Sequence, residues 1–161
     1  MIYESPQPEI LSPDVIAEMK ELPEFIDDTT AYASIAKLLR YNIGFTWNLL
    51  NEKEQIFPFQ EFILNGWFKK DYSLYMAARA LGKSFLIAIF CLLYAIFYPG
   101  SKIVIVSSNF RRSKDIFSKM EKFLNSKGQN LLAPNFILPP SKQNDKYLLK
   151  CVNGSEIAGL P

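Results

Sequence analysis

The fold of this chain is decided by residues 72–98, which read YSLYMAARALGKSFLIAIFCLLYAIFY. Residues 72–77 are mostly apolar in the manner of a strand, and residues 85–98 form an apolar run that favours a buried helix. Between them, residues 78–84 read ARALGKS. A strand, a tight loop containing Gly-Lys-Ser and a helix in this order predict a phosphate-binding loop, because the helix N-terminus and the loop amides attract an anion.

The residues of this loop have expected roles at a bound nucleotide. Lys83 supplies a positive charge for the β- and γ-phosphates, and Ser84 offers a hydroxyl to Mg²⁺. Arg79 is suited to stabilise the charge that develops during phosphoryl transfer, so Arg79 and Lys83 are the expected catalytic residues. Residue 77 is alanine where the usual loop has its first glycine, and a plainer alternative is that Gly82 simply opens a core helix. The expected nucleotide-binding residues of the loop are Ala78, Arg79, Ala80, Leu81, Gly82, Lys83 and Ser84.

A glutamine that precedes the loop suits the base of a nucleotide. Gln60 lies beside Phe59 and Phe62. Its amide can both donate to and accept from the edge of an adenine, and an aromatic ring offers a stacking surface. With the loop, Gln60 therefore predicts ATP and Mg²⁺ as the cofactors; the alternative is a glutamine on a helix surface.

Basic residues gather in the second part of the chain. Residues 62–161 carry 14 basic and 5 acidic side chains, against 4 basic and 11 acidic in residues 1–61, so the second part favours a polyanion. The sequence SSNFRRSK lies at the C-terminal end of a strand predicted over residues 102–107. Ligands of open α/β sheets bind outside such strand ends. A solvated helix face is the alternative. The residues expected to contact DNA phosphates are Arg111, Arg112 and Lys114.

Composition excludes several classes of function. The 161 residues include no histidine, which excludes a histidine general base, a Ser-His-Asp triad and the commonest zinc sites. Cys91 and Cys151 lie in separate apolar runs, as buried free thiols do. The apolar run over residues 85–98 is shorter than the ~20 residues of a membrane span, so no membrane role is expected.

Periodicity and turn residues predict the order of the elements. An extended arm is expected over residues 1–13, and the alternation of strand and helix that follows the loop predicts a parallel α/β sheet. The expected helices cover residues 13–22, 27–40, 47–54, 58–65, 83–98 and 113–125. The expected strands cover residues 72–77 and 102–107, followed by a loop over 128–141 and a hairpin over 146–157 that turns at Asn153-Gly154. The chain thus divides into an acidic, mainly helical segment, residues 1–54, and a phosphate-loop domain, residues 55–161.

These features resemble the N-terminal part of tailed-phage terminase large subunits. The phosphate loops of that family often lack the first glycine and carry an early arginine, as residues 78–84 do. The Phe59-Gln60 pair resembles the family's adenine-binding motif, and residues 102–125 resemble its second strand and the following helix. Residues 147–160, which contain NGSEI, resemble the family's hairpin before its acidic strand.

The resemblance implies an ATPase with a RecA-like P-loop fold, in which helices flank a parallel sheet that is incomplete in this chain. It implies an enzyme that couples ATP hydrolysis to translocation of double-stranded DNA into a procapsid, in the host cytoplasm. A portal protein, a terminase small subunit and a ring oligomer on the procapsid are the implied partners. The acidic Mg²⁺ motif and the nuclease of the family are not among these residues, so we expect the chain to be cut within the domain.

Two further functions stay open. A superfamily 2 helicase-like translocase shares a glutamine, a phosphate loop and a Ser-Ser-Asn element, although Arg79 and the Asn-Gly-Ser hairpin favour the terminase. A non-catalytic remnant would bind nucleotide without turnover.

Overall fold

The computed structural model describes residues 28–51, 53–126, 130–143 and 146–160. The chain divides into two compact units, residues 1–35 and 36–161, and every element of the candidate sites belongs to the second. The arm and the first helix predicted from the sequence lie outside the described residues.

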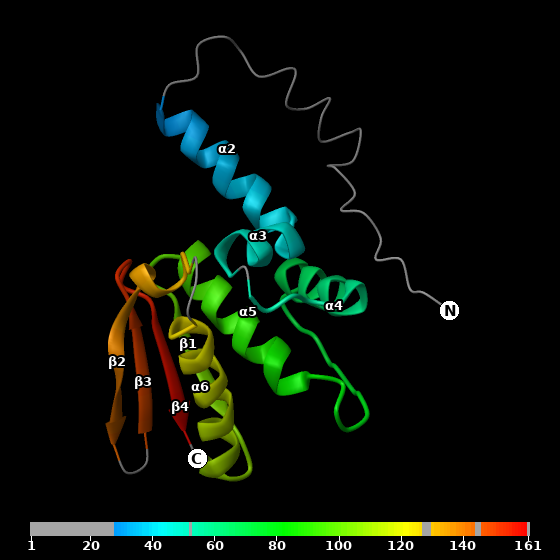
Figure 1. The fold of residues 1–161 in the computed structure, drawn as a ribbon, viewed down its shortest axis with the longest axis vertical. Coiled ribbons are helices and arrows are strands. Elements are labelled where there is room, and N and C mark those ends of the chain that lie inside the picture. Colours follow the sequence, from blue (N-terminus) through cyan, green and yellow to red (C-terminus); the bar gives the residue numbers. More distant parts are fainter. Residues whose placement is uncertain (1–27, 52, 127–129, 144–145, 161) are drawn as a thin grey trace. The chain divides into compact units, whose positions relative to one another are not determined.

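The second unit combines helices with one sheet (Figure 1). The helices are α2 (Asp28–Tyr41), which crosses the boundary between the units, α3 (Ile43–Leu50), α4 (Pro58–Lys69), α5 (Lys83–Phe97) and α6 (Phe110–Leu124). The strands are β1 (Lys102–Val106), β2 (Phe136–Gln143), β3 (Lys146–Cys151) and β4 (Glu156–Leu160), with a short 3-10 helix, η1 (Ala133–Asn135), before β2. The sheet order is β1-β4-β3-β2, and β1 and β4 are parallel while the other pairs are antiparallel. The sheet is therefore mixed, which corrects the prediction of a parallel one.

Helix α5 is the centre of the core, as its almost unbroken apolar sequence predicts. It packs against α4, α6, β1 and β4, so apolar side chains are buried on nearly all of its sides. Burial raises the pKa of the Cys91 thiol to about 12, which keeps it protonated and chemically inert at neutral pH. Among the described residues, no helix has the length and apolar character needed to cross a membrane.

Helices α5 and α6 cover one face of the sheet (Figure 1). The apolar side chains of α6 recur every three or four residues and are buried, whereas its charged side chains are exposed. A close approach fixes the packing of α6 on β4, because a Cβ atom at Gly159 would lie 2.7 Å from the Phe117 ring. Only glycine fits at this point.

The predicted hairpin is confirmed, and its turn residues hold the end of α5. β3 and β4 pair around Asn153-Gly154, where Gly154 has φ 86°. The Asn153 amide donates to the carbonyls of Ala95 and Ile96 at 2.8 and 3.1 Å. The Ser155 hydroxyl donates to the carbonyl of Tyr98, the residue that caps the C-terminus of α5, at 2.9 Å. These bonds satisfy carbonyls that the C-terminus of a helix leaves without partners.

The strand predicted over residues 72–77 is wrong. The described structure has no ladder partner for this segment, and without a neighbour the backbone of a strand leaves its N–H and C=O groups unpaired. Tyr72, Leu74 and Met76 are 84–94% exposed, whereas Tyr75 is half-buried against Trp67, with ring centroids 5.8 Å apart. One contact point thus ties the segment to α4.

The loop predicted over residues 128–141 is wrong in its second half, which contains η1 and most of β2. Two prolines, Pro139 and Pro140, favoured a loop because proline cannot donate to a ladder. β2 is an edge strand of the sheet, and its register with β3 shifts between Ile137 and Ser141, around these prolines. An edge strand with an irregular register tolerates prolines that a central strand would not.

Candidate nucleotide site and basic pocket

The loop over residues 78–82 curves tightly into α5. Ala80 and Gly82 have φ values of 67° and 75°, in the left-handed region. Gly82 caps α5, and its carbonyl accepts from the Leu86 amide at 2.9 Å. Residues 79 and 80 form a turn, and within the part of the chain that the structure describes no group accepts a hydrogen bond from the amides of residues 82–85. These N–H groups, together with the helix N-terminus, are therefore free to bind an anion.

Lys83 turns back toward the start of the loop. Its ammonium donates to the carbonyls of Ala77 and Ala78, at 2.6 Å each. The charge is thus held at the mouth of the loop, and one of its three N–H donors is left for another acceptor. A lysine in this position can exchange its carbonyl partners for phosphate oxygens, which carry more negative charge.

Gln60 lies against the loop, although the two are distant in sequence. It is buried in the first turn of α4, and its side-chain oxygen accepts from the Phe57 amide at 3.0 Å. A Cβ atom at Gly82 would lie 3.0 Å from the Gln60 amide nitrogen, so the glutamine reaches the loop glycine. The acceptor half of the amide is occupied, and the donor half faces the loop.

The aromatic side chains beside Gln60 form an exposed surface. Phe57 and Phe59 stack with centroids 6.0 Å apart and an angle of 12° between their rings, and both are exposed. Phe62, the other ring predicted from the sequence, is 80% exposed and has no stacking partner among the described aromatic residues. Phe57 was not predicted, and the Pro that follows it is the signal that places it at the start of α4.

Arg79 and Ser84 complete the predicted loop residues. The Arg79 side chain is exposed, and Ser84 is half-buried in the first turn of α5. Across the described residues, no group of three or more His, Cys, Asp or Glu side chains could hold a metal ion. One hydroxyl, loop amides and a lysine form a donor set that fits a phosphate group, with Ser84 as the only predicted metal ligand.

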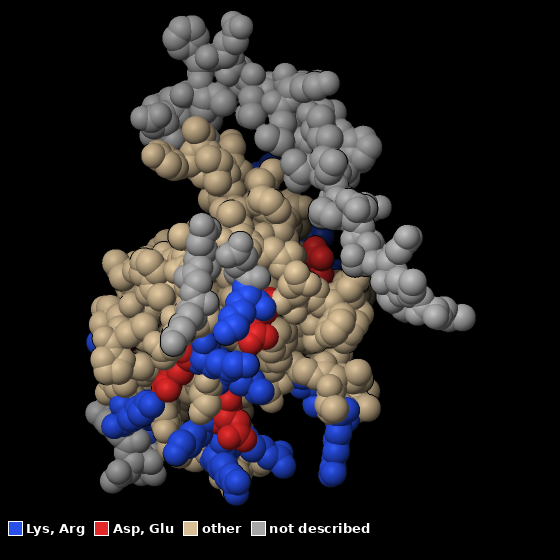
Figure 2. Space-filling model, viewed as in Figure 1, with Lys and Arg blue, Asp and Glu red and all other residues tan. Residues whose placement is uncertain are grey.

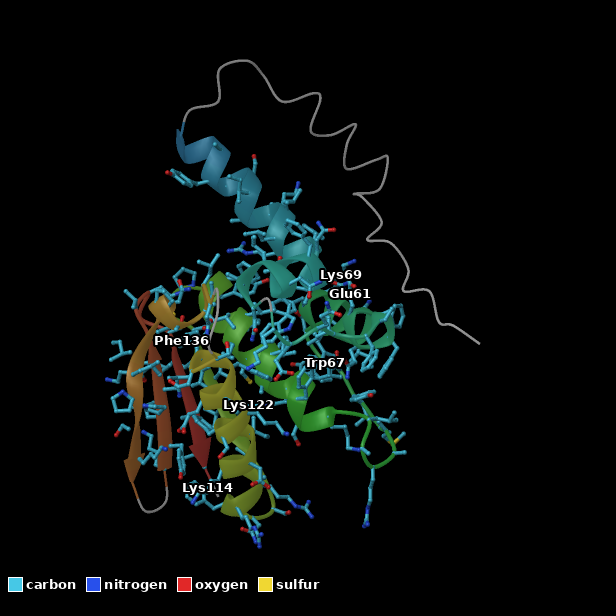
Figure 3. All side chains as sticks on the ribbon, viewed as in Figure 1. Glu61, Trp67, Lys69, Lys114, Lys122 and Phe136 are labelled. Carbon is cyan, nitrogen blue, oxygen red and sulfur yellow. The ribbon has the colours of Figure 1, made fainter. Side chains whose placement is uncertain are left out.

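The predicted basic element forms the start of α6, which begins three residues earlier than expected. Asn109 caps the helix, because its side-chain oxygen accepts from the Arg111 amide at 2.9 Å. Figure 1 shows that α5 and α6 both begin at the end of the unit where β4 ends. Figure 2 shows Lys and Arg side chains gathered over α6, and Figure 3 places Lys114 near its beginning and Lys122 further along. Arg111, Arg112 and Lys114 are all exposed.

Polar side chains anchor this end of α6 to the sheet. The hydroxyls of Ser107 and Ser113 lie 2.8 Å apart, and Ser113, which is fully buried, donates to the carbonyl of Leu160 at 3.0 Å. Ser107 also donates to the carbonyl of Asn109. Two of the three polar side chains of the Ser-Ser-Asn element are thus used inside the protein, which weakens the argument for a helicase-like strand contact.

A basic pocket opens beside the first turn of α6. It has a volume of about 720 Å³ and includes two of the predicted residues, Arg111 and Lys114, but not Arg112. Lys142, on β2, was not predicted, because the predicted loop ends at residue 141, the predicted hairpin begins at residue 146, and no strand was expected between them. The residues that line the basic pocket are Asn109, Phe110, Arg111, Lys114, Asp115, Lys142 and Tyr147.

The comparison with known protein families agrees with the resemblance. The family described as "Terminase large subunit, T4likevirus-type, N-terminal" matches residues 74–160, which is more than half of the chain and includes the loop, α5, α6 and all four strands. No curated protein matches the chain. The chain therefore belongs to the family of terminase large subunits, of the T4-like-virus type, in its N-terminal region.

Proposed function

We propose that this chain is the ATP-binding part of a viral DNA-packaging motor, in which a RecA-like P-loop ATPase couples ATP hydrolysis to translocation of double-stranded DNA into a procapsid. Membership of the terminase large subunit family supports the proposal that the chain is a component of a packaging motor. The observation that carries the nucleotide site is the contact between Gln60 and Gly82, which brings two separately predicted binding elements together.

The loop would hold the phosphates mainly through its backbone. The free amides of residues 82–85 lie at the N-terminus of α5, where the helix dipole also favours negative charge. Lys83 would release the carbonyls of Ala77 and Ala78 and bind the β- and γ-phosphates. Ser84 would be a ligand of Mg²⁺, which supplies charge neutralisation at the phosphates when bound.

The base and the transferred phosphoryl group would be recognised by side chains. The free donor of Gln60 suits a ring nitrogen of adenine, and the exposed pair of Phe57 and Phe59 offers a stacking surface. The exposed Arg79 can move to the γ-phosphate and stabilise its charge, which is the role that arginine has in many NTPases.

We also propose double-stranded DNA as the partner of the basic residues Arg111 and Lys114. A portal protein and a terminase small subunit, with a ring oligomer on the procapsid in the host cytoplasm, follow from the family and not from contacts in this chain. The exposed charge over α6 supports a polyanion at this surface (Figure 2).

An equilibrium titration with Mg-ATP tests the nucleotide site. The Lys83→Ala variant should bind Mg-ATP at least about tenfold more weakly, which corresponds to about 1.4 kcal/mol, because the only cation held within the loop is lost. Lys102→Ala is the matched control, since Lys102 is exposed on β1, away from the loop. Equal affinities of the parent chain and Lys83→Ala for Mg-ATP would exclude a phosphate-binding role for the loop.

A phosphate-release assay separates the motor from the non-catalytic remnant. ATP turnover by the parent chain above the Lys83→Ala background supports an active ATPase. Binding of Mg-ATP without release above that background favours the remnant, because the loop then binds nucleotide but does not hydrolyse it.

A further inference from the structure

The basic pocket beside α6 combines cations from two elements that are remote in sequence. Arg111 and Lys114 come from the first turns of α6, and Lys142 comes from β2. Three cations and one carboxylate, Asp115, line the pocket, so its charge is positive. Neither Arg111 nor Lys114 forms an ion pair with another described residue, which leaves both guanidinium and ammonium available to a ligand.

The register of the hairpin explains why Lys142 reaches the pocket. Lys142 pairs directly with Tyr147 across β2 and β3, and opposite residues of an antiparallel pair point to the same face of the sheet. Tyr147 is buried against Phe110 and Phe117 of α6, with ring centroids 5.4 Å apart in both pairs. Lys142 therefore lies on the face that α6 covers, and its ammonium is 5.9 Å from the centre of the Tyr147 ring.

Glu121 holds this ammonium in place. The two carboxylate oxygens lie 2.9 and 3.1 Å from the Lys142 nitrogen. The hydrogen bond to Glu121 raises the pKa of Lys142, so the lysine stays charged at neutral pH. Lys142 remains half-exposed on the pocket side, and its remaining N–H donors can bind a ligand without loss of the ion pair.

We propose that the basic pocket binds a phosphodiester group of the DNA backbone, and that Lys142 is a third phosphate-contacting residue beside Arg111 and Lys114. The inference rests on the proposed DNA partner, and it adds a defined point of contact. The cavity of about 720 Å³ is open, and its lining offers no set of paired donors and acceptors that would recognise the edge of a base. The proposed contact with the DNA backbone is therefore independent of the DNA sequence.

The salt dependence of DNA binding tests the pocket. The affinity of the full chain for a labelled DNA duplex is measured by fluorescence anisotropy over a series of NaCl concentrations. The slope of log K against log [salt] is about −0.9 for each phosphate contact, so Lys142→Ala should decrease the magnitude of the slope by about 0.9. Lys142→Arg should restore the slope of the parent chain, because an arginine keeps the charge and the donors.

Lys150→Ala is the matched control. Lys150 lies on β3, in an ion pair with Glu156 at 3.5 Å, and the alternation of β3 places it on the face of the sheet opposite to Tyr147. Its slope should equal that of the parent chain. An unchanged slope for Lys142→Ala, an equal decrease for Lys150→Ala, or no DNA binding by the parent chain would each overturn the inference.

Mg-ATP titrations of the same variants separate this inference from the nucleotide site. Lys142→Ala should bind Mg-ATP with the affinity of the parent chain, because the pocket is proposed for a phosphodiester and not for the nucleotide. A decrease in Mg-ATP affinity for Lys142→Ala would overturn the inference. A failure of the Lys83→Ala test would count against the phosphate loop alone.

Discussion

Residues 72–82 and helix α5, which follow each other in the chain, are held by different means. α5 satisfies its own backbone hydrogen bonds and is buried among α4, α6 and the sheet. Residues 72–82 have no ladder partner among the described residues, and Leu74 is 86% exposed. The contacts that hold them are few: Tyr75 packs on Trp67, Gln60 reaches Gly82, and Lys83 binds two carbonyls of the loop.

A buried helix is stable once its apolar sides are packed, whereas a strand is stable only when a neighbouring strand pairs with it. A buried helix is complete once its apolar sides are covered, because its hydrogen bonds are internal. A strand leaves its N–H and C=O groups without partners until another strand pairs with it. The phosphate loop lies between a region of each kind, and its free amides suit the binding of an anion in place of structural partners.

Paired truncations in the two regions test this difference most strongly. Leu92→Ala, in the fully buried part of α5, should lower the free energy of unfolding by about 2–5 kcal/mol, because the variant leaves a cavity. Leu74→Ala removes the same atoms from an exposed side chain and should change it by less than about 0.5 kcal/mol. Urea denaturation measures both, and similar losses for the two variants would mean that residues 72–77 are buried in solution.

The same difference decides which elements could be predicted from the sequence. α5, β1 and the hairpin carry their signals locally, in apolar periodicity and in Asn153-Gly154, and all were predicted within one to three residues. The prediction of a strand over residues 72–77 was wrong because a strand also needs a partner strand, and the local sequence does not show whether one is present. β2 was missed because Pro139 and Pro140 indicate a loop, and only the position of the strand at the edge of the sheet allows them.

The candidate sites divide in the same way. The loop residues and Gln60 are motif positions, so the sequence predicted both, and the structure added that they touch. Arg111 and Lys114 follow from the charge at the start of α6. Lys142 joins them only through the register of β2 and β3, which no local pattern reveals.

A smaller effect is expected within the loop itself. Ala80 has φ 67°, where an L-residue is strained, so Ala80→Gly should raise the free energy of unfolding by about 0.5 kcal/mol once the added chain entropy is subtracted. Ala78→Gly is the control: Ala78 does not have a positive φ, and its replacement should lower stability by about 0.4–1 kcal/mol. The same sign for both variants in thermal denaturation would contradict the left-handed turn.

Hydrogen exchange of the backbone amides tests the phosphate-binding loop most directly. Addition of Mg-ATP should slow exchange at residues 82–85, whose amides have no acceptor among the described residues, and should leave the start of α6 unchanged. The protection should be lost in Lys83→Ala. Slower exchange around Arg111 and Lys114 with no change over residues 82–85 would contradict a nucleotide site in this loop, because the nucleotide would then bind in the basic pocket.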